Sequence, residues 1–210
     1  MDIIRDQLVS GLQALSLSAT PEQTQQLLDF ISLIAKWNKA YNLTAIRRPE
    51  EMVGLHILDS LAIAPYVSGK RIIDIGTGAG LPGIPLAIIL PDKQFVLLDC
   101  NAKKTRFVQQ ALLELKLENV EVRHQRVEDY QPDSLFDTVI TRAFANLADI
   151  VRLTAHLSAL NGVLLAMKGQ NPELELAEVT TDAQTTIIPI TVPGVDAQRC
   201  LIKLEHPSAR

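Results

Sequence analysis

The chain has 210 residues, of which 47% are hydrophobic and 21% charged, and its net charge is −4. This composition indicates one globular domain with a sizeable core and excludes a disordered or low-complexity chain. The negative charge argues mildly against a nucleic-acid binder, although a local basic patch can still serve that purpose.

The N-terminal third of the sequence predicts helices. Residues 1–5 lack the basic start and long apolar run of a signal peptide. Since no uncharged apolar stretch reaches about 18 residues, we expect no membrane span. The run Thr20-Pro21-Glu22-Gln23 has the pattern of a capping box. Apolar residues then recur at helical spacing up to Trp37 and Tyr41, which are therefore expected in the core rather than as platforms for base stacking.

A second helix is predicted from Pro49 to about Ala64, with acidic residues in its first turn. His56 and Asp59 lie three residues apart on this helix and so share a face. We favour an ion pair or a helix-fixing hydrogen bond between them, and a role in a functional site is the alternative. Residues 1–68 are interpreted as a helical extension packed on a domain of residues 69–210, the two forming one compact unit.

From residue 71 onward, strands alternate with helices. Short apolar runs predict strands at 71–76, 95–99, 120–123, 138–141 and 162–167, and helical patterns fall at about 83–90, 102–115 and 147–158. Two more runs, 186–192 and 199–204, flank a Pro-Gly turn like an antiparallel pair. This order predicts a doubly wound, Rossmann-like α/β fold with a mostly parallel seven-stranded sheet and an antiparallel C-terminal hairpin. Ligands of such folds bind at the carboxyl ends of the strands.

The glycine-rich segment from Asp74 to Gly83 carries the strongest functional signal. Asp-x-Gly-x-Gly-x-Gly at a strand end is the pattern of methyltransferases that use S-adenosylmethionine (SAM). The glycines from Gly78 to Gly83 also satisfy the dinucleotide pattern Gly-x-Gly-x-x-Gly, so a dehydrogenase-like domain is the competing interpretation. A purely structural turn would explain one of these glycines well but not three of them together with two acidic residues.

Three features favour SAM. Asp74 lies just before the first glycine, where its carboxylate can attract the amino-acid end of the cofactor directly or through water. Gly76 turns the chain before the dinucleotide glycines begin, and Pro82 and Pro85 remove N–H groups that a pyrophosphate would need. Asp99, after the second strand, suits a ribose hydroxyl in either interpretation. The predicted cofactor residues from this pattern are Asp74, Gly76, Gly78, Gly80, Asp99, Val127 and Glu128, the last two beside the adenine.

Several motifs in the same order carry a resemblance that covers nearly the whole chain. They are KWNKAYNLT at 36–44, HILDS at 56–60, GTGAGLPG at 76–83, TRAF at 141–144 and KGQ at 168–170. In these motifs the chain resembles the bacterial ribosomal small-subunit methyltransferase G family, also called glucose-inhibited division protein B. The resemblance implies methylation of N7 of a guanine in 16S ribosomal RNA, near the decoding centre. It also implies that Gly76, Leu81 and Arg142 contact SAM, with Val127 and Glu128 at the adenine.

Two positions depart from the family pattern. Ala79 stands where the family often has proline, which we expect to alter only the stiffness of the loop. Leu55 stands where arginine is common before the histidine, which removes one positive charge that would otherwise be available to RNA.

The expected chemistry needs no general base, because guanine N7 has a free lone pair and the sulfonium methyl group is already activated. The TRAF segment after the fourth strand differs from the Asn/Asp-Pro-Pro-aromatic segment that serves exocyclic amino groups. The two cysteines, Cys100 and Cys200, lie far apart and outside a Pro-Cys context. We therefore expect no metal, no disulfide framework and a reducing cytoplasmic location.

Basic residues near the predicted ligand edge are candidates for RNA binding, namely Lys103, Lys104, Arg106, Arg123 and Arg126. For each of them alone a solvated surface charge is the simpler interpretation. Lys168 ends the fifth strand and has either a substrate-positioning or a structural role, as do Arg142 and Phe144. The expected partner is small-subunit ribosomal RNA or the small ribosomal subunit, bound by a monomer. The alternatives are a SAM-dependent methyltransferase for a small molecule or protein, and a cofactor-binding module without transferase activity.

Overall fold

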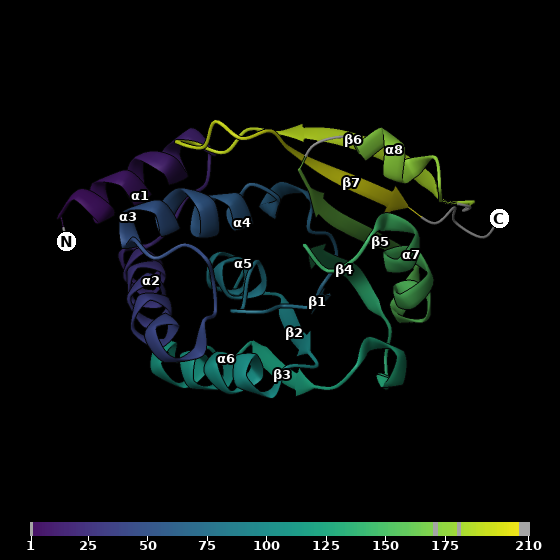
Figure 1. Cartoon of the computed structure of the whole chain (residues 1–210), viewed down its shortest axis with the longest axis horizontal. Coiled ribbons are helices and arrows are strands. Elements are labelled where there is room, and N and C mark those ends of the chain that lie inside the picture. Colours follow the sequence, from purple (N-terminus) through teal and green to yellow (C-terminus); the bar gives the residue numbers. More distant parts are fainter. Residues whose placement is uncertain (1, 170–171, 180–181, 206–210) are drawn as a thin grey trace.

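A computed structural model describes residues 2–169, 172–179 and 182–205. One seven-stranded sheet forms the centre of the molecule, with helices on both faces (Figure 1). Its strand order is β3-β2-β1-β4-β5-β7-β6. The parallel strands are β1 (Arg71–Ile75), β2 (Gln94–Asp99), β3 (Val120–His124), β4 (Phe136–Arg142) and β5 (Ser158–Lys168). The hairpin of β6 (Gln184–Ile190) and β7 (Arg199–Glu205) is antiparallel, as predicted.

Side chains of the central strands alternate between two hydrophobic cores, because successive residues of a strand point to opposite faces. Ile72 and Leu97 lie in the larger core, while Ile73 and Leu98 lie in the smaller one. The larger core is covered by α1 (Asp2–Ala14), α2 (Pro21–Tyr41), α5 (Gly83–Ile89) and α6 (Ala102–Leu115). The smaller core is covered by α7 (Leu147–Thr154).

Helix α2 begins at the predicted capping box. The Thr20 hydroxyl accepts from the Gln23 N–H, and the Gln23 side chain accepts from the Thr20 N–H. Near the other end of the helix, the Trp37 ring lies 4.9 Å from the Tyr41 ring and 5.7 Å from the Phe107 ring of α6, centroid to centroid. Trp37 and Tyr41 are thus partly buried packing residues, in accord with the prediction.

The predicted helix 49–64 is built from distinct segments. These are α3 (Pro49–Met52), a π-helical segment (Val53–Leu58), α4 (Asp59–Leu61) and a 3₁₀ turn (Ala64–Tyr66). The Asp59 N–H donates to the carbonyl of Gly54, five residues back. Gly54 packs so closely on the loop before β7 that an added Cβ would lie 3.1 Å from Val195. The wide helical turn therefore lies where this helix meets the C-terminal hairpin.

The structure differs from the prediction at two places in the C-terminal half. The helix expected to reach residue 158 ends at Thr154, where a 3₁₀ turn (Ala155–Leu157) leads directly into β5. A short helix, α8 (Pro172–Leu176), was not predicted. None of the described helices is both long and apolar enough to cross a lipid bilayer.

A candidate site of two adjoining cavities

The strand order reverses beside β1, which pairs with β2 on one side and with β4 on the other. Connections therefore leave the carboxyl ends of these strands in opposite directions and open a crevice, where open α/β sheets bind ligands. Two cavities lie at this edge. The glycine-loop cavity, of about 350 Å³, is lined by Gly76, Asp99, Lys104, Arg126, Glu128 and Phe144 among others. The arginine cavity, of about 390 Å³, is lined by His56, Asp59, Arg142, Lys168, Arg199 and Cys200 among others.

The glycine loop depends on left-handed backbone conformations. Gly76, Gly78 and Gly80 have φ of +68°, +59° and +80°, values that side-chain-bearing residues rarely adopt. An added Cβ at Gly76 would lie only 2.7 Å from the ring of Phe144. Gly76 is therefore required both for the turn and for the close approach of the aromatic ring that lines the cavity.

Asp74, in β1, stabilises this loop through two hydrogen bonds. Its Oδ2 accepts from the Thr77 hydroxyl at 2.7 Å and from the Gly83 N–H at 3.0 Å. The side chain is fully buried, and its Oδ1 has no partner within the described part of the chain. Burial raises the pKa of Asp74 to about 6, although the hydrogen bonds from Thr77 and Gly83 oppose that rise.

Asp99 presents a fixed carboxylate to the glycine-loop cavity. Its Oδ2 accepts from the Gly78 N–H at 2.9 Å, and its Oδ1 accepts from the Asn101 N–H at 2.8 Å. Each carboxylate oxygen can accept a further hydrogen bond, because each has two lone pairs. The arrangement can thus hold a diol such as a ribose edge.

The other predicted cofactor residues fall into two groups. Val127 and Glu128 lie on a 3₁₀ turn (Val127–Asp129) and line the glycine-loop cavity. Gly80 and Leu81 turn away from it: an added Cβ on Gly80 would meet Ile84 at 2.5 Å, and the Leu81 side chain is buried in the larger core. The Leu81 N–H donates to the carbonyl of Thr77, so this residue shapes the loop.

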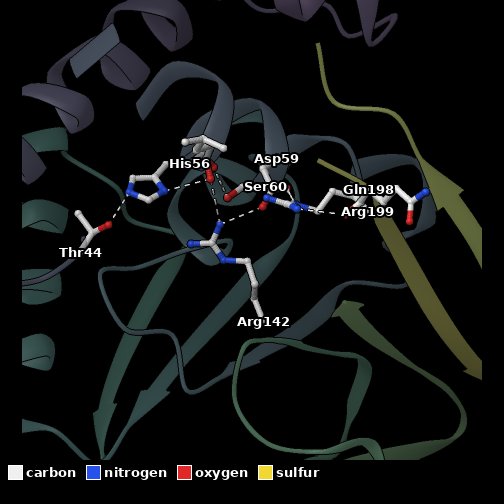
Figure 2. Close-up of polar contacts among 8 residues, drawn as sticks. Thr44, His56, Asp59, Ser60, Arg142, Gln198 and Arg199 are labelled. Carbon is white, nitrogen blue, oxygen red and sulfur yellow. Dashed lines mark hydrogen bonds and ion pairs between the residues drawn. The ribbon is translucent and has the colours of Figure 1, made fainter. Parts of the chain in front are cut away.

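In the arginine cavity, one carboxylate bridges two guanidinium groups (Figure 2). Asp59 Oδ2 lies 3.0 Å from Arg142 Nη1, and Asp59 Oδ1 lies 2.9 Å from Arg199 Nε. Asp59 begins α4, Arg142 ends β4 and Arg199 begins β7, so residues up to 140 positions apart in the chain meet here. The predicted side-chain contact between His56 and Asp59 is wrong: the Asp59 oxygens accept from the two arginines, and the His56 ring nitrogens bond Leu55 and Thr44 instead.

His56 is neutral in this cavity. Burial, with the nearby Arg142 charge as a second cause, lowers its pKa to about 4. Its Nδ1 lies 3.0 Å from the Leu55 carbonyl, to which Nδ1–H donates, so Nε2 accepts from the Thr44 hydroxyl at 2.9 Å. Asn38 in turn fixes Thr44 by bonding both its N–H and its carbonyl, each at 3.0 Å.

Two further polar side chains of the arginine cavity, Lys168 and Cys200, are engaged in hydrogen bonds. Lys168 Nζ donates to Glu175 Oε2 at 2.7 Å and to the Ala145 carbonyl at 2.8 Å. Burial raises the pKa of the Cys200 thiol, which donates to the Gly169 carbonyl. Lys168 thus lines the cavity while tying the end of β5 to α8.

The predicted RNA-binding residues do not all lie together. Lys103, Lys104 and Arg106 open α6, and Lys104 and Arg126 line the glycine-loop cavity. Arg123 instead pairs with Glu121 and lines a different cavity beside Tyr130. In the described residues, no three histidine, cysteine, aspartate or glutamate side chains gather as a metal site.

Sequence reasoning missed the cluster around Asp59. The motifs that contain Thr44, His56 and Arg142 were visible, yet no spacing rule places them together, since they come from three distant segments. Arg199 had no local signal, because it is a single basic residue at the start of a strand. Ala143, with φ of +51°, lines both cavities and places them side by side.

Comparison with known proteins gives a consistent result. Residues 23–202 match a family model described as rRNA small subunit methyltransferase G. A protein of that name from Psychromonas ingrahamii is 49% identical over 95% of this chain and 99% of its own length. Another, from Marinobacter nauticus, is 51% identical over 93% of this chain and 92% of its own.

Solved structures share the fold at low sequence identity. A SAM-dependent methyltransferase from Aquifex aeolicus matches this chain with a TM-score of 0.56 at 16% identity. The match covers 73% of this chain and 92% of the Aquifex protein. The N-methyltransferase NodS from Bradyrhizobium japonicum matches with a TM-score of 0.56 at 12% identity. The match covers 83% of this chain and 98% of NodS. The fold is therefore the Rossmann-like fold of SAM-dependent methyltransferases.

Proposed function

The chain belongs to the rRNA small subunit methyltransferase G family, and on that premise we propose that it methylates N7 of a guanine in small-subunit ribosomal RNA. We place the guanine near the decoding centre, and the enzyme acts as a monomer in the cytoplasm. The methyl donor is SAM, which supplies an activated methyl group on a sulfonium.

The glycine-loop cavity fits this donor. Asp99 offers two fixed oxygen acceptors to the ribose, and Val127 and Glu128 lie where the adenine would be read. Gly76 keeps the loop backbone free of side-chain atoms beside Phe144. Asp74 acts through the loop that it holds, together with Gly78, Gly80 and Leu81. Arg142 lines the arginine cavity and not the glycine-loop cavity, but its neighbour Ala143 lines both, which leaves Arg142 close enough to contact the cofactor or the substrate.

One observation supports N7 as the target atom: the arginine cavity holds no group ready to remove a proton among the residues that the structure describes. His56 is neutral and uses both ring nitrogens. Asp59 accepts from an arginine at each oxygen. A nucleophile that must first lose a proton would find no base there, whereas guanine N7 attacks through its free lone pair. The protein's task is to align this atom with the donor.

The binding of RNA depends on basic side chains at the same edge. Lys103 and Arg106 are exposed at the start of α6, and Lys104 and Arg126 lie at the glycine-loop cavity. These four residues are placed to contact phosphates around the entrance. Arg123 is the weakest of the candidates, since Glu121 already pairs with it.

The test is mass mapping of 16S ribosomal RNA from cells that lack the protein. We expect one guanine to lose one methyl group, and expression of the wild-type protein to restore it. Expression of the Asp99→Ala variant should not restore it. The alternative methyltransferase function would be favoured by two results together. The ribosomal RNA of the deletion strain would be unchanged, and the purified protein would transfer methyl groups to a small molecule or a protein.

A further inference from the structure

The arginine cavity has more positive than negative charge. Arg142 and Arg199 share the single carboxylate of Asp59, and each bonds a different oxygen of it. Lys168 is balanced by Glu175, and His56 is neutral. With Glu175 counted, the charged side chains at the cavity therefore carry one more positive than negative charge, and the buried Asp74 carboxylate offsets part of this excess at Arg142.

Both arginines keep N–H groups that no described residue bonds, and Arg199 is the more exposed of the two, with 27% of its side chain exposed against 21% for Arg142. The Nε of Arg199 donates to Asp59 and its Nη1 donates to the carbonyl of Gln198. Its Nη2 has no partner within the part of the chain that the structure describes. The Arg199 side chain is 27% exposed, whereas the Asp59 side chain that orients it is 6% exposed (Figure 2). A guanidinium held at one edge and free at another is suited to bind an anion with little loss of entropy.

We propose that Arg199 binds a backbone phosphate of the target nucleotide and that Asp59 is the positioning residue that orients it. The proposal rests on the proposed function, in which the base of that nucleotide enters the arginine cavity. RNA is the anion that fits best, because Arg199 lines the arginine cavity and is not part of the glycine-loop cavity. The carboxylate of the cofactor is the competing anion, and the experiment separates the two.

The experiment compares the wild-type chain with Arg199→Gln, Arg199→Lys and a matched control, Arg152→Gln. Arg152 is also paired with a carboxylate, that of Asp149, but lies exposed on α7 outside both cavities. For each protein, binding to unmethylated small-subunit RNA is measured at several salt concentrations, and binding of SAM is measured by calorimetry. Steady-state methylation then gives KM for the RNA and kcat.

We expect Arg199→Gln to reduce the slope of log affinity against log salt concentration by about one, as for the loss of one phosphate contact. KM for RNA should rise about tenfold, with kcat and SAM affinity close to wild type. Arg199→Lys should keep the salt slope because it keeps the charge, and Arg152→Gln should behave as wild type.

An unchanged salt slope in Arg199→Gln would overturn the proposal, since a purely structural role does not change the number of phosphates bound. A loss of SAM affinity in that variant would also overturn it and assign Arg199 to the cofactor. Because RNA binding is measured without methyl transfer, a failure to methylate guanine N7 would affect the proposed function alone. A wild-type chain that does not bind the RNA would overturn both.

Discussion

At the scale of single residues, the site is formed largely by backbone geometry rather than by reactive side chains. Gly76 and Gly78 adopt left-handed conformations, and Asp74 and Asp99 hold the turn between them by accepting N–H and hydroxyl hydrogen bonds. The glycine pattern predicted this turn correctly. It did not reveal that Asp74 would be wholly buried, because burial depends on how the loop folds over the strand end.

Gly76→Ala should weaken SAM binding at least tenfold. The new methyl group would lie 2.7 Å from Phe144, and the left-handed φ of +68° costs a residue with a side chain about 1–2 kcal/mol. Calorimetric titration measures the affinity. Gly194→Ala is the matched control, since its φ is +75° and an added Cβ there meets nothing within 4 Å. The control should lose some stability but bind SAM as wild type; equal affinity in both variants would contradict the placement of the cofactor.

Asp74→Asn should change how stability depends on pH. The pKa of Asp74 is about 6 in the folded chain and 3.8 as the ordinary value, so folding takes up a proton between these pH values. Wild-type stability contributed by this group is therefore present below pH 4 and is lost as pH rises to about 6. Asparagine cannot ionise, and its amide oxygen can still accept from Thr77 and Gly83.

The free energy of unfolding of Asp74→Asn, relative to wild type, should therefore increase by about 2–3 kcal/mol between pH 4 and pH 7. Urea denaturation at a series of pH values measures it. His56 is the opposite case, because its lowered pKa makes stability fall as pH drops from 6.5 towards 4. That contribution is the same in both proteins and cancels in the comparison. A difference that stays constant across this range would contradict the assigned pKa.

At the scale of elements, local patterns predicted most helices and strands. The capping box placed the start of α2, and short apolar runs placed the five parallel strands and the C-terminal hairpin. The π-helical segment 53–58 was not predictable, because its apolar residues fit an ordinary helix and its close packing on the distant loop at Val195 leaves no local signal. Helix α8 was missed because a segment of five residues has too few turns to show a period.

The candidate site was predictable only in part for the same reason. The glycine-loop cavity is built mainly from neighbouring motifs at the ends of adjacent strands, which topology brings together. The arginine cavity needs the N-terminal helices, β4 and β7 to meet, and that contact is a property of the tertiary fold. A helical spacing of three residues suggested that His56 bonds Asp59, but long-range arginine partners outcompeted that local pair.

At the scale of the whole molecule, the N-terminal helices complete the larger core. Phe30 of α2 and Phe107 of α6 are both fully buried, with ring centroids 6.4 Å apart. Gln26 of α2 also donates to the carbonyl of Leu115 at the end of α6. We therefore propose that residues 1–68 and 69–210, although distinct in sequence pattern, fold as one unit.

A fragment of residues 69–210 should accordingly fail to fold cooperatively, because α5 and α6 would expose apolar faces that α2 covers in the full chain. Circular dichroism during heating measures the transition, with the full chain as the reference. A sharp thermal transition in the fragment, together with SAM binding, would show instead that the residues 69–210 are an independent domain.

Position 143, which lies between the two cavities, tolerates few types of residue. Its left-handed backbone disfavours most side chains, and a β-branched or aromatic residue would be strained there. Glycine would relieve that strain but would loosen the end of β4 that positions Arg142. Asparagine tolerates the conformation, but on the proposed function its amide would stand between the methyl donor and the guanine. Alanine, the smallest residue with a Cβ, keeps the end of β4 stiffer than glycine would and places only one methyl group between the two cavities.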